Sequence, residues 1–200
     1  MSENNYNSSW WKEAKAQSLE RKKSKPKKGS GDSFLIVTEG TVSEPIYFDL
    51  MRDKLELSAV KVRVEPGEHS HPRHVIRTAE KEVTQLAKRA KKNQLAVDEV
   101  ARYDQVWAVI DTDVANREGI WHEVEAQAKA AGVKLAYTSP CIEFWFLLHL
   151  KYSSAFIENG TAAKALVSHE LGGNYSTNRE EAEASISSFF HNWPEAVVRG

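Results

Sequence analysis

The sequence of 200 residues contains a single cysteine, Cys141. A single cysteine excludes a disulfide within the chain and a metal site made of several cysteines. We therefore expect a reducing, cytoplasmic location. No apolar run is longer than that of Phe144–Leu148, whereas a membrane helix needs about 20 residues. The start of the chain carries no apolar segment typical of a signal peptide. These absences predict a protein with no membrane association.

The chain also has no large excess of positive or negative charge, since its net charge is only −1. The basic residues are nevertheless concentrated, with eight Lys or Arg against two acids between Lys12 and Lys28. We expect residues 1–32 to form a basic, disordered arm. It is either a solvated tail or a nucleic-acid contact in which Trp10 and Trp11 stack on bases. The expected phosphate contacts are Lys22, Lys23, Lys25, Lys27 and Lys28.

From Phe34 onward, short apolar runs alternate with helical patterns. The runs predict strands at 34–37, 60–64, 106–110 and 133–137, and the helical patterns predict helices at 43–57, 75–90, 117–131, 141–150, 162–171 and 179–190. Strands separated by helices pair in parallel through right-handed crossovers. We therefore expect an α/β domain over 33–200 with a doubly wound, mainly parallel four-strand sheet and flanking helices. Within it, 151–200 is a helical C-terminal extension that ends abruptly, as if its last helix were cut short.

Acidic residues follow two of the predicted strands. Glu39 and Gly40 come after the first strand, and Asp111 and Asp113 come after the third. Ligands bind at the carboxyl ends of strands in such sheets, and an extended chain would direct both aspartates to one side. Carboxylates without a nearby thiolate favour Mg²⁺ or Mn²⁺ and suit phosphodiester hydrolysis. The same Asp-x-Asp pattern also occurs as a helix cap and in sugar-nucleotide transferases.

Two further acids and one histidine are supporting candidates. Glu44 lies in the first turn of a predicted helix, where the helix dipole alone favours an acid. Glu143 lies near the start of the apolar helix after Pro140 and is either a ligand or base of the acidic site or a first-turn cap. His149, on the same helix, is either packed in the core or part of the site's support.

Three histidines and two arginines complete the candidates. His69, His71 and His74 form a group that is either a transition-metal site, a phosphate contact or incidental. Arg73 and Arg77, on the following helix, are either phosphate contacts or part of a solvated face.

Taken together, these residues resemble one family. The segments run from Phe34 through Glu39-Gly40 to Ser43-Glu44-Pro45, then through Val109–Asp113, and finally from Ser139 to His149. Their order and spacing are similar to those of the RloB-like family of abortive phage resistance proteins, regarded as a divergent branch of the Toprim fold. The Toprim signature, a Glu after the first strand and Asp-x-Asp after the third, matches Glu39, Asp111 and Asp113. The chain departs from the family pattern at Ser139, where Asn is usual, and after Tyr175, where Lys is common.

The resemblance implies a Mg²⁺- or Mn²⁺-dependent nuclease acting in antiviral defence. It implies a DNA or RNA substrate, with tRNA among the candidates, and a P-loop ATPase partner from the same locus. The alternative is a non-catalytic nucleic-acid-binding or regulatory partner of such an ATPase.

Overall fold

The computed structural model describes residues 33–55, 61–66, 71–92, 103, 105–173, 175–176 and 178–200. The chain divides into two units, Met1–Gly31 and Asp32–Gly200, and every described residue lies in the second. The five lysines expected to contact phosphate, together with Trp10, Trp11 and His69, lie outside the described residues. The arm predicted over 1–32 therefore stays a prediction.

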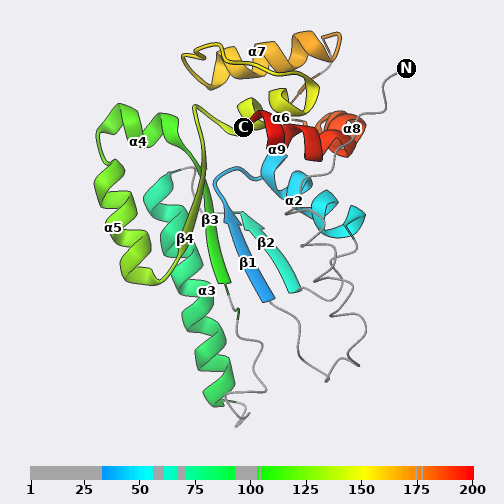
Figure 1. The fold of residues 1–200 in the computed structure, drawn as a ribbon. Coiled ribbons are helices and arrows are strands. Elements are labelled where there is room, and N and C mark those ends of the chain that lie inside the picture. The colour runs from blue at the N-terminus through cyan, green and yellow to red at the C-terminus, as the bar shows by residue number, and fades with distance from the viewer. Residues whose placement is uncertain are drawn as a thin grey trace. The chain divides into compact units, whose positions relative to one another are not determined.

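The second unit is built on a parallel β-sheet (Figure 1). Its strands are β1 (Ser33–Thr38), β2 (Lys61–Pro66), β3 (Gln105–Asp111) and β4 (Lys134–Thr138), in the order β2-β1-β3-β4. All three neighbouring pairs run parallel. The chain crosses from one side of β1 to the other between β2 and β3, so the carboxyl ends of β1 and β3 meet at the point where the winding reverses. Ligands bind at this point in open α/β sheets.

Helices flank the sheet on both sides. Helix α3 (Pro72–Lys92) packs on β1 and β3 and also on α5 (Trp121–Ala131). Leu35 and Val37 alternate with half-buried neighbours along β1 and meet Val75 and Ile76 of α3 in a first hydrophobic core. Helix α2 (Ser43–Lys54) contacts β2 instead (Figure 1). The expected α/β architecture, a parallel open sheet with flanking helices, is confirmed.

A second hydrophobic core lies among the helices that follow the sheet. It joins α2 to α6 (Ile142–Leu150), α7 (Gly160–Glu170) and α8 (Arg179–Phe189). Its centre is aromatic, since the ring of Tyr47 lies 5.6 Å from that of Phe146 and 5.3 Å from that of Phe190. After α8, the chain forms a 3₁₀ turn, Phe190–Asn192, and a last helix, α9 (Trp193–Arg199). The sequence prediction gave this last helix no residue range of its own, although it expected 151–200 to be helical.

Two local predictions are wrong. The helix expected over 117–131 is two helices, α4 (Thr112–Glu118) and α5, because Gly119 between them adopts a left-handed φ of 67°. Helix α4 also begins directly after Asp111, so the chain is not extended between Asp111 and Asp113. Among the described residues, no helix is both long and apolar enough to span a membrane.

Candidate functional site

The site begins with two carboxylates at the ends of neighbouring strands. Glu39 prolongs β1, and its amide donates to the carbonyl of Val109 on β3 at 3.0 Å. In return, the amide of Asp111 donates to Glu39 Oε2 at 3.2 Å, and Thr138 of β4 donates to Asp111 Oδ1 at 3.0 Å. The sheet register therefore determines where both side chains lie.

Helix α2 adds a third carboxylate. The backbone amide of Gly40 donates to Glu44 Oε1 at 2.8 Å, which draws the Glu44 side chain back over the turn after β1. Both Glu39 and Glu44 are buried. A Cβ on residue 40 would overlap the Glu44 carboxylate, so a larger residue here would displace the Glu44 side chain.

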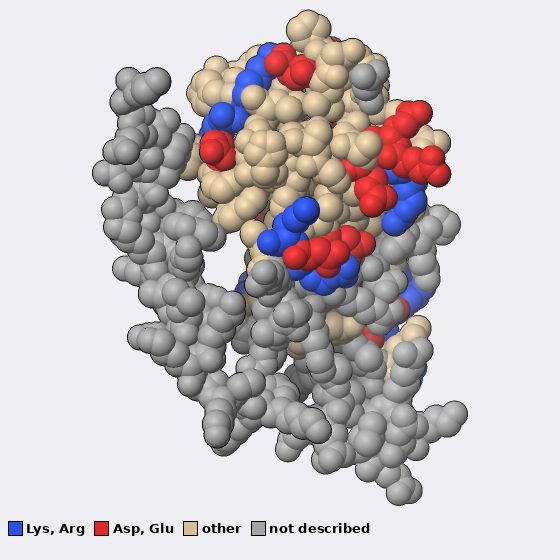
Figure 2. Space-filling model, turned by 90° about the vertical axis from the view of Figure 1, so that its right-hand side faces the viewer, with Lys and Arg blue, Asp and Glu red and all other residues tan. Residues whose placement is uncertain are grey.

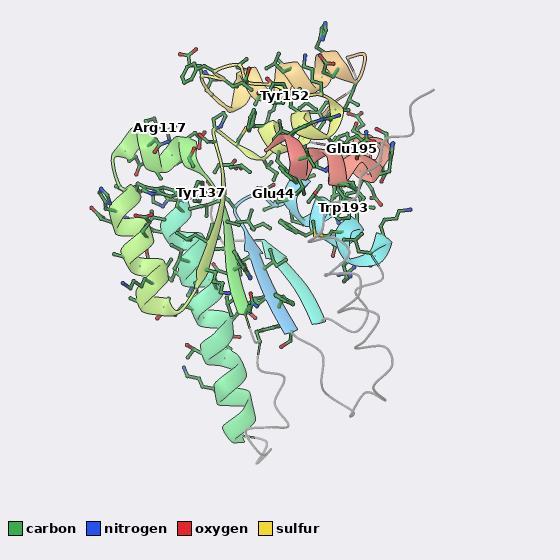
Figure 3. All side chains as sticks on the ribbon, viewed as in Figure 1. Glu44, Arg117, Tyr137, Tyr152, Trp193 and Glu195 are labelled. Atoms are coloured by element: carbon green, nitrogen blue, oxygen red, sulfur yellow. The ribbon has the colours of Figure 1, made fainter. Side chains whose placement is uncertain are left out.

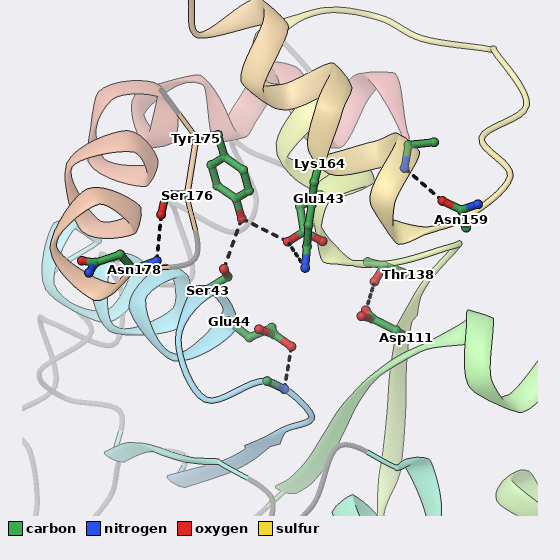
Figure 4. Close-up of polar contacts among 12 residues, drawn as sticks. Ser43, Glu44, Asp111, Thr138, Glu143, Asn159, Lys164, Tyr175, Ser176 and Asn178 are labelled. Carbon is green, nitrogen blue, oxygen red and sulfur yellow. Dashed lines mark hydrogen bonds and ion pairs between the residues drawn. The ribbon is translucent and has the colours of Figure 1, made fainter. Parts of the chain in front are cut away.

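Helix α6 supplies a fourth carboxylate, Glu143, which is 3% exposed. The Tyr175 hydroxyl donates to Glu143 Oε1 at 3.1 Å and lies 3.1 Å from the Ser43 hydroxyl (Figure 4). Lys164 Nζ lies 3.8 Å from the same Glu143 oxygen. Ser43, the first residue of α2, therefore belongs to a hydrogen-bonded chain that leads through Tyr175 to Glu143.

The fifth carboxylate is on a helix and not on an extended chain. Asp113 lies in the first turn of α4, where its Oδ1 accepts from the amide of Val114 at 2.6 Å. Its own amide donates to the Pro140 carbonyl at 3.3 Å, which connects α4 to the segment before α6. We refer to Glu39, Glu44, Asp111, Asp113 and Glu143 as the acid cluster.

Burial and nearby negative charges make three of these acids, Glu39, Glu44 and Asp111, hard to ionise. Burial, with the charges of Asp113 and Glu44 adding to it, raises the pKa of Glu39 to about 7. Burial raises the pKa of Asp111 to about 8, and the nearby Glu44 and Glu39 contribute to the increase. The pKa of Glu44 is raised by burial and by Glu143, while Lys164 opposes the increase. Ionising these carboxyls would therefore concentrate negative charge in a buried place, and a bound cation would favour their charged forms.

The donor set fits a hard divalent cation in its chemistry, since it consists of carboxylate oxygens. In the described part of the chain, however, no three His, Cys, Asp or Glu side chains converge as metal ligands. Glu39 and Glu44 instead accept hydrogen bonds from backbone amides. Holding a metal ion would require side chains of the cluster to adopt other rotamers.

Comparison with known protein families identifies the family of this chain. The model of the RloB-like protein family matches residues 34–199, a span that contains the whole acid cluster. The chain belongs to the RloB-like protein family. No curated protein and no solved structure matches it.

In this RloB-like protein, His149 lies apart from the acids, in the aromatic core. Its Nδ1 is 2.9 Å from the Trp145 carbonyl and is therefore the protonated nitrogen, so its Nε2 accepts from the Tyr47 hydroxyl at 3.2 Å. The residue is fully buried, and burial lowers the pKa of its imidazole. Its contacts are those of a packed, neutral core histidine.

The remaining candidates lie on α3 or just before it, and Arg73 and His71 have structural partners. Arg73 forms an ion pair with Glu123 of α5, and Arg77 is exposed. His71 Nε2 lies 3.2 Å from Glu118 of α4, and its ring is 5.5 Å from that of His74. On the face shown in Figure 2, described acidic and basic side chains lie side by side. Arg52 of α2 pairs with Asp49 and Asp53.

Three members of the site were missed by sequence reasoning. Thr138 is the last residue of β4 and lies opposite Asp111 in the register. The strand predicted over 133–137 ends one residue before it and so pointed to its position. Lys164 and Tyr175 come from the C-terminal helical segment, where no local pattern distinguishes them from surface residues. Only the packing of α7 and α8 against α6 brings them to Glu143.

Proposed function

We propose that this RloB-like protein is a metal-dependent phosphodiesterase that cuts nucleic acid, on a sheet of the Toprim type. The observation that supports the proposal best is the pair formed by Glu39 and Asp111 on neighbouring strands. The backbone amide of Asp111 donates to the Glu39 carboxylate, and burial together with repulsion from neighbouring acids opposes the ionisation of both side chains. Sites of this kind accept divalent cations, because the cation offsets the charge that the protein leaves uncompensated.

Glu39, Asp111 and Asp113 are the residues that would hold Mg²⁺ or Mn²⁺. When bound, the ion would stabilise the negative charge that develops on the phosphodiester oxygens. Glu143 is the proposed proton acceptor for the attacking water, because Tyr175 holds its carboxylate in one orientation. Glu44 positions the turn after β1 through the Gly40 amide.

The biological setting that we propose is antiphage defence, with a P-loop ATPase as partner and a cytoplasmic location. This part rests on family membership. An alternative is a regulatory partner of the ATPase without catalysis of its own. It is favoured by the side-chain positions in the described residues, where the acids engage backbone amides and no three of them converge as ligands.

Cleavage assays separate the two candidates. Labelled plasmid DNA, single-stranded DNA and bulk tRNA would be incubated with wild-type protein in Mg²⁺, in Mn²⁺ and in EDTA. We expect cutting that depends on the metal and falls by about a hundredfold or more in Asp111→Asn. Asp49→Asn, which changes a half-exposed acid of α2 that pairs with Arg52 and is not part of the cluster, serves as the matched control and should cut normally.

Metal binding can be measured without cutting. A cation that binds only the folded state raises the melting temperature. We expect Mg²⁺ to raise it in wild type and in Asp49→Asn, but not in Asp111→Asn. Mg²⁺ that leaves all three melting temperatures unchanged, with no cutting alone or with the ATPase, would contradict the enzyme proposal and favour the regulatory one.

A further inference from the structure

Two large aromatic side chains are exposed on the segment 151–159, which connects α6 to α7. Phe156 is 92% exposed and Tyr152 is 66% exposed, and the segment contains neither helix nor strand. Figure 3 shows Tyr152 beside α6 and α7. Full exposure of a Phe side chain leaves apolar surface in water that a ligand can cover.

The segment is held in place on both sides of Phe156. Ile157, the next residue, is buried in the second hydrophobic core. Asn159 Oδ1 accepts from the amide of Ala162 at 3.0 Å and so caps α7. At the other end, Lys151 pairs with Glu170 of α7 at 2.6 Å. The segment that bears the two rings is therefore fixed at both ends, which lowers the entropy cost of binding a ligand.

This segment ends beside the acid cluster. A Cβ on Gly160, the first residue of α7, would lie 3.5 Å from Cys141 Sγ, next to the start of α6. Lys164 lies one turn later on the same face of α7 and directs Nζ toward Glu143. In chain order, the exposed aromatic residues thus come shortly before Lys164, which itself lies at Glu143 of the acid cluster.

From this order we propose that the segment 151–159 is a stacking surface for unpaired bases and that Lys164 contacts the backbone phosphate between those bases and the acid cluster. The substrate class is then a single-stranded or looped nucleic acid. Aromatic rings stack on any base whose face is exposed, whereas the bases of a duplex present only their edges. This inference rests on the nuclease proposal and specifies its substrate.

Equilibrium binding tests the stacking surface. Fluorescence anisotropy would measure the affinity of the full chain, with Asp111→Asn as common background and Mg²⁺ present, for a labelled single strand and for the matching duplex. We expect Tyr152→Ala/Phe156→Ala to weaken single-strand binding by about tenfold or more and to leave duplex binding unchanged. Val198→Ala, which changes an exposed apolar residue of α9, is the control and should bind both as the background does.

Two lysines with similar exposure test the phosphate contact. The side chains of Lys164 and Lys151 are 48% and 44% exposed, and each pairs with a glutamate, but only Lys164 lies at the acid cluster. We expect Lys164→Ala to weaken single-strand binding and to reduce its salt dependence, and Lys151→Ala to do neither. Phe156→Trp should restore the affinity that Phe156→Ala loses.

Three results would overturn the inference. They are single-strand affinity unchanged by Tyr152→Ala/Phe156→Ala, equal losses for single strand and duplex, and no binding of a single strand by the background protein. Equal losses would instead indicate a docking surface for another macromolecule. Failure of the nuclease proposal is recognised separately, because wild type would then cut nothing while its binding still depended on Phe156.

Discussion

A side chain at position 40 would collide with the carboxylate that organises the turn after β1. Gly40→Ala places a methyl group where Glu44 Oε2 now lies, so Glu44 must leave the Gly40 amide. We expect a loss of about 1–3 kcal/mol in the free energy of unfolding, measured by urea denaturation. Gly160→Ala is the control, since its Cβ would make an ordinary contact of 3.5 Å with Cys141.

The cause can be isolated with a second change. If the collision with Glu44 is responsible, Gly40→Ala should cost much less in a Glu44→Ala background, because the two changes share one contact. Additive losses would show that the backbone at Gly40, and not Glu44, is the source of the effect.

Protonation of His149 should destabilise the fold in mild acid. Burial lowers the pKa of His149 in the folded protein, so below a histidine's usual pKa the unfolded chain binds the proton more readily. Stability is therefore lost as the pH falls. We expect wild type to lose about 1 kcal/mol over the first pH unit below about 6.5, relative to His149→Gln.

The comparison with His149→Gln matters because the acids titrate as well. The pKa values of Glu39 and Asp111 are raised, so their effect on stability has the opposite sign and weakens the fold as the pH rises. These contributions are present in both proteins and cancel in the difference. If the urea midpoints of wild type and His149→Gln change by the same amount between pH 7.5 and 5.5, the interpretation of His149 is contradicted.

At the scale of elements, the C-terminal helices help to build the site as well as the second core. Tyr175 links Ser43 of α2 to Glu143 of α6 through one hydroxyl. We expect Tyr175→Phe to lower the free energy of unfolding by about 1–2 kcal/mol, because buried Glu143 loses a donor. Tyr152→Phe removes an exposed hydroxyl and should cost little in the same thermal or urea measurement.

The helices and strands also show how much of the fold and of the site could be predicted from the sequence. Strand ends were predictable because apolar runs such as 34–37 and 106–110 stop abruptly at acids, and this located Glu39 and Asp111. The break at Gly119 was missed because the apolar pattern continues across it. Tyr175 and Lys164 were missed because the chain separates them from Glu143 and only tertiary packing joins them. Helix α9 was not predicted as a separate helix because its seven residues are too few to establish a period.

At the scale of the whole molecule, the basic residues before Ser33 should govern the salt dependence of nucleic-acid binding. Changing Lys22, Lys23, Lys25, Lys27 and Lys28 to Gln removes five positive charges. If all five contact phosphate, the slope of log affinity against log salt should fall by about four, measured by anisotropy over a salt series. Lys88→Gln/Lys129→Gln, at exposed positions on α3 and α5, is the control, and equal slopes in both variants would support a solvated tail.

The acid cluster also lies between the two hydrophobic cores. Glu39 and Asp111 are carried by strands of the first core, whereas Glu44 and Glu143 are carried by helices of the second. The distances between the carboxylates therefore depend on how the helices of the second core are positioned against the sheet. A protein that bound only α7, α8 or α9 and moved these helices relative to the sheet would change the distances between the acids. It would regulate the site without contacting it.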